Sequence, residues 1–376
     1  MRFLILLFAF LPFAAFAQTP PGLTAKAWLL LDYNSGQVLA AQEPDQRLEP
    51  ASLTKVMTTY LVAAALKQKT LSPDQSVTIS ERAWRTQGSR TFLRVGSQAQ
   101  VDTLFKGMVV QSGNDASVAL AEAVAGTEEA FAERMNKEMQ RLGLKNTHFL
   151  NASGYFEGAE PKHYSTARDL AGLAVALIRD HPEAHALHSI KEYTHDGIKQ
   201  HNRNRLLWLD PTVDGLKTGH SSNAGYCLIA TSKRGPRRLI AVILNTPSEN
   251  ARADDAQKLL NWGFLSFDAA KIYDKDQAIS QLKVFKGSSN TVAAGFKEDF
   301  VVSLPKGVAT QAGKVGAQLE SVQPLIAPVA AGSKVGTLKL TVDGKPYGEY
   351  PVVALSDVPV AGMIGRAWDS IKLFFQ

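Results

Sequence analysis

The stretch that decides how this chain folds is Glu49-Pro50-Ala51-Ser52-Leu53-Thr54-Lys55-Val56-Met57-Thr58-Thr59-Tyr60-Leu61-Val62. Pro50 suits the start of a helix, and the apolar run after Lys55 predicts a helix that is buried on nearly all sides. Residues three apart on a helix lie on one face, so Ser52 and Lys55 should be neighbours. A lysine can take the proton of a serine hydroxyl if burial or nearby charge lowers its pKa. We therefore predict that Ser52 is a nucleophile and that Lys55 activates it.

Two more polar segments bear on this prediction. Ser112-Gly113-Asn114 lies between two apolar helical stretches, where Gly113 permits a tight turn that would point its neighbours into a cleft. Lys217-Thr218-Gly219-His220 places a cation and a hydroxyl on what reads as a strand edge. A terminal carboxylate would bind that pair, and Gly219 would let the substrate backbone approach. The ordinary alternatives are a helix N-cap for the first segment and a hairpin with a solvated lysine for the second.

The order of apolar and turn-forming stretches predicts an α+β fold. A hairpin is expected at 27–41, with strand character returning at 213–218, 226–232 and 239–245. Helices are expected between these strands at 102–111, 116–124, 128–142 and 165–179, and after them at 251–265. One antiparallel sheet would then be built from both ends of this region, with a helical insert beside it. Clefts form at such junctions, and the Ser52 helix would lie there.

Both termini carry signals of their own. Residues 1–17 combine a basic start, an apolar run and Ala15-Phe16-Ala17, which predicts a cleaved secretory signal peptide rather than a membrane anchor. Residues 18–268 would form the domain that holds Ser52, and 269–357 a small all-β domain. The last stretch, 358–376, has an apolar stripe at helical spacing and predicts an amphipathic helix that lies on a membrane surface; docking on the β domain is the alternative.

Composition narrows the kinds of binding partner and site that this chain is expected to have. The formal charge is +6, of which Arg2 contributes one, and the mature chain should therefore suit an anionic cell-wall or membrane surface. Nucleic acid is not expected, because the one dense basic group, 233–238, reads as a solvated hairpin turn. Cys227 is the only cysteine and should be a buried core thiol. The three histidines of 181–188 have a spacing that could line up on a helix, but Pro182 interrupts the run and there is no His-Glu-x-x-His, so a metal site is not expected there.

The three motifs together resemble those of the serine acyl-transferases that bind penicillin. Two spare Ser-x-x-Lys matches, at 280–283 and 303–306, are not followed by Lys-Thr-Gly. Over essentially its whole length the chain resembles low-molecular-mass penicillin-binding proteins of the D-alanyl-D-alanine carboxypeptidase type, with a β-lactamase/transpeptidase-like fold. Further strings that carry the likeness are His163-Tyr164-Ser165-Thr166-Ala167-Arg168-Asp169-Leu170, Asn202-Arg203-Asn204-Arg205-Leu206-Leu207-Trp208, Asp214-Gly215-Leu216-Lys217-Thr218-Gly219-His220 and Lys258-Leu259-Leu260-Asn261-Trp262-Gly263-Phe264.

The resemblance implies roles for the motif residues. Ser52 would attack the carbonyl between two D-alanines, Lys55 would accept its proton, and Ser112 would relay a proton to the departing amine. Asn114 would hold the peptide side of the substrate. Lys217 would add positive potential near Ser112 and, with Thr218, would orient the terminal carboxylate, near which Arg252 would lie. The backbone N–H groups of Ser52 and His220 would form the oxyanion hole. No metal or organic cofactor would be needed.

The expected substrate is a peptidoglycan stem peptide that ends in D-Ala-D-Ala, and β-lactams would be covalent inhibitors. The enzyme would act on the periplasmic side of the cytoplasmic membrane, attached through its C-terminal helix. Three other functions are considered: a DD-endopeptidase that cuts crosslinks, a β-lactamase, and a catalytically silent wall-binding module. The β-lactamase is less favoured because Glu157, Glu160 and Glu183 are not followed by the Leu-Asn of a Glu-x-x-Leu-Asn segment.

Overall fold

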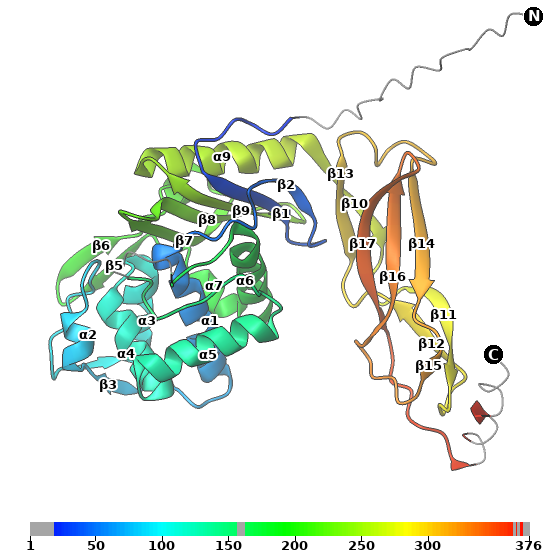
Figure 1. Ribbon diagram of the computed structural model, residues 1–376, viewed down its shortest axis with the longest axis horizontal. Coiled ribbons are helices and arrows are strands. Elements are labelled where there is room, and N and C mark those ends of the chain that lie inside the picture. The colour runs from blue at the N-terminus through cyan, green and yellow to red at the C-terminus, as the bar shows by residue number, and fades with distance from the viewer. Residues whose placement is uncertain (1–18, 156–161, 364–365, 367–368, 371–376) are drawn as a thin grey trace, which may run out of the picture.

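A computed structural model describes residues 19–155, 162–363, 366 and 369–370. It has an N-terminal domain of helices packed on a sheet and an elongated C-terminal domain of strands (Figure 1). The two domains have separate hydrophobic cores, and helix α9 (Glu249–Ser266) runs directly into the first C-terminal strand, β10 (Phe267–Tyr273). The predicted order of an α+β domain followed by an all-β domain is confirmed.

The N-terminal domain is organised on one five-stranded antiparallel sheet. Its order is β2 (Val38–Gln42), β1 (Ala27–Asp32), β9 (Arg237–Thr246), β8 (Gly225–Arg234) and β7 (Val213–Ser221). Strand β1 pairs with β9, with Leu29 opposite Val242, so the sheet is assembled from distant parts of the chain as predicted. Leu29 faces the core of the helical insert, whereas Leu30 faces a second core under α9, because successive side chains of a strand point to opposite faces.

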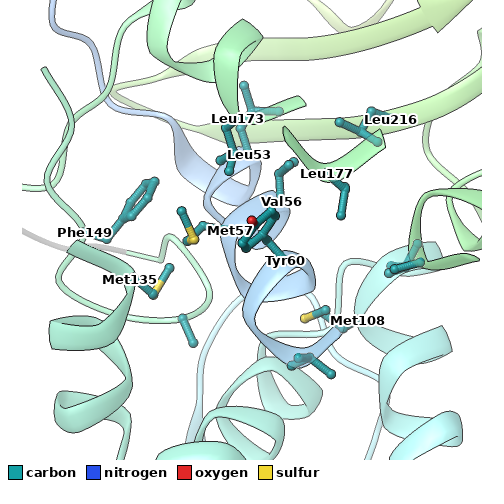
Figure 2. Packing of buried hydrophobic residues seen from close by; sticks show 14 of the residues in the cluster. Leu53, Val56, Met57, Tyr60, Met108, Met135, Phe149, Leu173, Leu177 and Leu216 are labelled. Atoms are coloured by element: carbon teal, nitrogen blue, oxygen red, sulfur yellow. The ribbon is translucent and has the colours of Figure 1, made fainter. Parts of the chain in front are cut away.

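The helical insert surrounds α1 (Lys55–Lys67). Figure 2 shows Val56, Met57 and Tyr60 of α1 among buried side chains from the other helices and from the sheet. The remaining helices are α2 (Glu81–Arg85), α3 (Val101–Val110), α4 (Asn114–Ala125), α5 (Glu128–Arg141), α6 (Ala167–Asp180), α7 (Pro182–Leu187) and α8 (Leu206–Leu209). Two small hairpins complete it, β3 (Ser76–Thr78) with β4 (Gln98–Gln100) and β5 (Glu192–His195) with β6 (Ile198–His201). The prediction that α1 is buried nearly all round is confirmed.

The start of this helix differs in one detail from the prediction. Ser52 lies in a 3₁₀ turn, η1 (Ala51–Thr54), and the α-helix begins only at Lys55. Ala51 has a φ of 46°, so the chain enters the turn sharply instead of continuing from a regular helical start. Ser52 and Lys55 are nevertheless neighbours, because a 3₁₀ turn also brings residues three apart to the same side.

Within its described residues up to 360, the C-terminal domain is built from strands. Strand β10 pairs with β13 (Phe300–Pro305). A six-stranded sheet has the order β14 (Val315–Ser321), β16 (Lys334–Val342), β17 (Lys345–Ala354), β12 (Thr291–Gly295), β11 (Ala278–Phe285) and β15 (Leu325–Ile326). The spare Ser-x-x-Lys matches begin on β11 and β13. Ser280 and Lys283 are three apart on one strand and therefore face opposite sides, so this match does not place its lysine beside its serine. In the other match Lys306 lies in the turn after β13.

The two domains meet at a small polar junction. Ser303 Oγ of β13 donates a hydrogen bond to Asp32 Oδ2 of β1, and both residues are fully buried. Arg237 donates to the carbonyl of Phe267 at 2.6 Å and is also buried. The prediction that 233–238 is a hairpin turn is confirmed, but its description as wholly solvated was wrong, since Arg237 is held in this junction.

Two predicted terminal features fall largely outside the described residues. The signal peptide at 1–17 lies there entirely, and so does most of the C-terminal amphipathic helix at 358–376. Among the described residues, no helix combines the length and apolar character that a membrane crossing requires.

Candidate active site

The three motifs meet at one cavity of about 730 Å³. Strand β7 forms the edge of the sheet next to η1, and the turn between α3 and α4 closes the opposite side. A Cβ on Gly219 would lie 2.8 Å from the carbonyl oxygen of Pro50, so only glycine lets β7 come this close to η1. Seven predicted site residues line the cavity: Ser52, Ser112, Asn114, Thr218, Gly219, His220 and Arg252.

Lys55 lies beneath the cavity and is fully buried. Its Nζ donates to Ser52 Oγ at 2.9 Å, to Asn114 Oδ1 at 2.7 Å and to the Ser153 carbonyl at 2.6 Å. Burial first, and then the positive charge of Arg203, lower the pKa of Lys55 to about 7. At neutral pH a large fraction of this amine is therefore unprotonated. In that form Nζ keeps two N–H groups for Asn114 and the Ser153 carbonyl, and its lone pair can accept the proton of the Ser52 hydroxyl, which is what a general base requires.

The α3–α4 turn is held by a buried carboxylate. Asp115 accepts the backbone N–H groups of Thr91 and Leu93, which fixes the neighbouring loop against the start of α4. Any side chain on Gly113 would collide with Thr91 Oγ1, so the central glycine of Ser-Gly-Asn is needed for close packing. Asn114 bridges the two sides, because its Oδ1 accepts from Lys55 and its Nδ2 donates to the Gln87 carbonyl at 2.5 Å.

Ser112 is in an unusual position in this turn. It has a φ of 67°, in the left-handed region, and it is almost completely buried at the cavity. Within the described part of the chain, its Oγ is buried and makes no hydrogen bond. A buried hydroxyl without a partner is costly, and a substrate bound in the cavity would supply the missing partner.

Lys217 is the second buried amine of the site. Its Nζ donates to the Thr218 carbonyl at 3.0 Å. Burial, followed by the charges of Lys55, Arg203 and Arg252, holds the pKa of Lys217 well below its usual range. Burial and the neighbouring cations thus disfavour the charged form of Lys217, and a carboxylate that enters the cavity would favour it again by supplying an opposite charge.

Arg252 is a buried residue of α9 rather than an exposed one. It lies on the first turns of α9, is nearly buried, and has its guanidinium 5.6 Å from the centre of the Tyr226 ring. Its Nη1 donates to the Gly219 carbonyl at 3.3 Å, and its Nη2 donates to the Arg203 carbonyl at 3.4 Å and to Glu249 Oε1 at 2.7 Å. These bonds connect α9 to the Lys-Thr-Gly strand.

A buried histidine supports the nucleophile turn from behind. The backbone N–H of Leu150 donates to His163 Nδ1 at 3.2 Å, so the proton must be on Nε2, which lies 2.8 Å from Thr54 Oγ1. Burial lowers the pKa of His163 to about 3, and the ring is therefore neutral near pH 7. Thr54 stands between Ser52 and Lys55, so this bond helps fix the turn that carries both.

Sequence reasoning missed several cavity residues. Arg203, Tyr155, Tyr226 and Glu249 line the cavity, and the carbonyl of Ser153 holds Lys55. Arg203 lies in one of the strings that carried the resemblance, but nothing in that string indicated a place at the cavity. The others lack any local pattern. Cys227 is buried as predicted, and burial raises the pKa of its thiol to about 11.

Comparisons with known proteins cover both domains. Residues 14–248 match the family described as D-alanyl-D-alanine carboxypeptidase, and residues 267–360 match the C-terminal domain of penicillin-binding protein 5. The chain is 42% identical to the D-alanyl-D-alanine carboxypeptidase DacA of Haemophilus influenzae over 365 residues, which are 95% of this chain and 91% of the relative. It is 40% identical to DacC of Escherichia coli over 381 residues, 98% of this chain and 94% of the relative.

Solved structures agree with these matches. Penicillin binding protein 5 from Haemophilus influenzae superposes with a TM-score of 0.80 at 42% identity, covering 91% of this chain and 99% of that one. Penicillin-binding protein D2 from Listeria monocytogenes, in its ampicillin-bound form, has a TM-score of 0.60 at 33% identity and covers 66% of this chain and 100% of its own. The chain therefore belongs to the D-alanyl-D-alanine carboxypeptidase family of serine peptidases and is a carboxypeptidase of the penicillin-binding protein type.

Proposed function

We propose that this enzyme removes the terminal D-alanine from peptidoglycan stem pentapeptides through an acyl-enzyme on Ser52. The observation that carries the proposal is the 2.9 Å bond between Lys55 Nζ and Ser52 Oγ at the floor of the cavity. A nucleophile in hydrogen-bond contact with a base whose pKa is about 7 is the arrangement that acyl transfer needs.

In the acylation step, Ser52 Oγ attacks the carbonyl carbon between the two D-alanines, and its proton passes to Lys55. The backbone N–H groups of Ser52 and His220 stabilise the oxyanion, each contributing about 3 to 4 kcal/mol at the transition state. The C–N bond then breaks as the proton reaches the leaving nitrogen through Ser112. D-alanine departs, and the stem peptide remains as an ester on Ser52.

Deacylation uses the same amine. A water molecule gives its proton to Lys55 as it attacks the ester carbon, and the Ser52 oxygen takes a proton back as the ester bond breaks. The products are D-alanine and a shortened stem peptide. Asn114 fixes Lys55 through its 2.7 Å bond in addition to its proposed contact with the peptide side of the substrate.

The terminal carboxylate is assigned to the basic end of the cavity. Thr218 contributes its hydroxyl, and Lys217 and Arg252 contribute positive charge. Both cations are almost completely buried, so water screens their field weakly and a carboxylate in the cavity would be held more strongly than at an open surface.

The experiment is release of D-alanine from a pentapeptide, measured by mass spectrometry for wild type and Ser52→Ala. We expect release by wild type only, and labelling of Ser52 by a fluorescent penicillin that Ser52→Ala abolishes. Adduct formation on another serine would overturn the assignment. Digestion of purified peptidoglycan in parallel tests specificity: consumption of crosslinked dimer in preference to monomeric pentapeptide would instead support the endopeptidase.

β-Lactams are proposed as covalent inhibitors of Ser52. The related Listeria protein has been solved in ampicillin-bound and cefotaxime-bound forms. We expect a penicillin adduct that persists long enough for intact-mass detection, with slow turnover of nitrocefin. Rapid nitrocefin hydrolysis without a stable adduct would favour the β-lactamase.

Export and membrane attachment are also proposed. The support is the signal-like sequence of 1–17 and the apolar stripe of 358–376. A chain ending at Val358 should stay in the supernatant when vesicles are pelleted, whereas the full mature chain should pellet with them. Co-sedimentation of the shortened chain would contradict the anchor, and both forms should release D-alanine equally.

A further inference from the structure

A carboxylate of the protein itself contacts the arginine at the active-site cavity. Glu249 Oε1 accepts from Arg252 Nη2 at 2.7 Å, and both residues line the cavity. The two partners differ in exposure: 51% of the Glu249 side chain is accessible to solvent but only 5% of the Arg252 side chain. The acid therefore reaches the arginine from the solvent side, which is also the side from which a substrate must come.

This contact is the strongest that Arg252 makes in the described structure. Its bonds to the carbonyls of Gly219 and Arg203 are longer, at 3.3 and 3.4 Å, and both acceptors are neutral. Among the described residues that line the cavity, Glu249 is the only acid. A carboxylate that enters the basic end thus meets a guanidinium already paired with another carboxylate.

Helix stability offers a different reason for an acid at this position. Glu249 is the first residue of α9 and follows the N-cap Ser248, where a negative charge is favourable. Glu81 has the same arrangement in α2: it follows the N-cap Ser80, pairs with Arg85 at 2.6 Å and is 63% exposed, but it does not line the cavity. Helix stability accounts for both acids, but it does not explain why one is paired with a buried arginine beside the catalytic serine.

We propose that Glu249 is an internal competitor for the carboxylate that Arg252 receives. The inference rests on the carboxylate-binding role proposed above for Arg252. On substrate binding, the terminal carboxylate replaces Glu249 at the guanidinium, and the Glu249 side chain turns into solvent. The same exchange runs in reverse after acylation. Because released D-alanine keeps its carboxylate, Glu249 weakens its retention and so favours its departure from the cavity.

The test compares Glu249→Gln with Glu81→Gln in the full mature enzyme. Both changes remove one negative charge from the first turn of a helix, so they match in net charge and in helix position. We measure kcat and KM for release of D-alanine from a pentapeptide, and the inhibition constant of added D-alanine. Fluorescent penicillin provides the concentration of active sites for each preparation.

In Glu249→Gln we expect KM and the D-alanine inhibition constant each to fall about two- to five-fold, a change that matches the interaction free energy of an exposed ion pair. The value of kcat should be at or below that of wild type. Glu81→Gln should leave both constants within about 1.5-fold of wild type. A role limited to helix stability would change the melting temperature of both variants but neither constant.

A KM that rises or stays constant in Glu249→Gln would overturn the inference, since Glu249 would then orient Arg252 or play no part in binding. Equal decreases in Glu81→Gln would overturn it as well, because the effect would then come from net charge. Failure of the proposed function would be recognised by a different result, because wild type itself would then neither release D-alanine nor be labelled by penicillin.

Discussion

The two domains bury different kinds of side chain. In the N-terminal domain, Lys55, Lys217 and Arg252 are almost completely buried within reach of one cavity, together with the polar residues Ser112 and Asn114. In the described residues of the C-terminal domain, the buried polar or charged residues are Ser303 and Asp369. Its core consists of apolar strand residues such as Leu338 and Val352.

This difference separates residues used for chemistry from residues used for stability. Burying an amine is unfavourable and lowers its pKa, which makes it a base near neutral pH but opposes folding. Burying leucine and valine favours folding and offers no chemistry. Substitutions of the buried polar residues at the cavity should therefore affect activity more than stability, and substitutions in the C-terminal core should do the reverse. Five predictions test this comparison.

The largest effect is expected for Lys55→Ala. Loss of the base should reduce kcat/KM for pentapeptide about 10³-fold, within the range of general base catalysis. Stability should fall as well, because the change leaves a cavity and removes the donor of the Ser153 carbonyl, but removal of a buried amine offsets part of this loss. Lys283→Ala, at the exposed lysine of a spare Ser-x-x-Lys match, is the control and should retain full activity. Comparable losses in both variants would refute the assignment.

Leu338→Ala should have the opposite pattern. This side chain is 1% exposed in the C-terminal core, and its truncation should lower the free energy of unfolding by about 2 to 5 kcal/mol. Activity at 25 °C should stay within two-fold of wild type, because the cavity lies in the other domain. Thermal unfolding and D-alanine release provide the two measurements. Inactivation while both domains are still folded would show that the C-terminal domain supports catalysis.

Ser112→Ala separates activity from stability within the catalytic domain. Activity should fall about 10²-fold because the proton relay is lost. Stability should be unchanged or about 1 kcal/mol higher, since the hydroxyl makes no hydrogen bond in the described structure. Ser117→Ala is the matched control: its Oγ donates to the Gly113 carbonyl at 2.7 Å, so it should lose stability and retain more activity. Urea unfolding measures the stability of both variants, and kcat/KM measures their activity. A clearly destabilised Ser112→Ala would contradict the assignment of Ser112 to catalysis rather than to stability.

Ser303→Ala tests the junction between the domains. Without the Ser303 hydroxyl, the buried Asp32 carboxylate loses a donor, and stability should fall by about 1 to 3 kcal/mol. Activity of the folded enzyme should be unchanged, because Asp32 does not line the cavity. Urea unfolding followed by fluorescence measures the loss. If stability were unaffected, the hydrogen bond between Ser303 and Asp32 would contribute nothing to the free energy of unfolding.

The pH profile should show the smallest change, about tenfold per pH unit. Only the unprotonated form of Lys55 accepts a proton, so kcat/KM should decrease as pH falls below about 7 and level off above it. The lowered pKa of Lys217 predicts that loss of its charge reduces kcat/KM at a pH below that at which an ordinary lysine loses its charge. A profile that is flat between pH 5 and 8 would contradict the role of Lys55.

The local sequence was enough to predict most helices and strands of the N-terminal domain and the motif residues of the site. The hairpin of β1 and β2, helices α3 to α6 and strands β7 to β9 lie within a few residues of their predicted positions, because each depends on the spacing of its own apolar and turn-forming residues. Ser52, Lys55, Ser112 and Lys217 were found because each belongs to a short motif whose chemistry can be recognised without coordinates.

What the sequence alone determined about this protein is therefore its order of elements, its motifs and the family they indicate. Only the tertiary structure decided that Arg252 is buried, that Glu249 and the Arg203 carbonyl accept hydrogen bonds from its guanidinium, and that the Ser153 carbonyl accepts one from Lys55. These relations join segments 49 and 98 residues apart, or depend on which face of α9 packs against the sheet. The physical reason is that burial and pKa are properties of the surroundings that folding brings together, and no local pattern of residues encodes them.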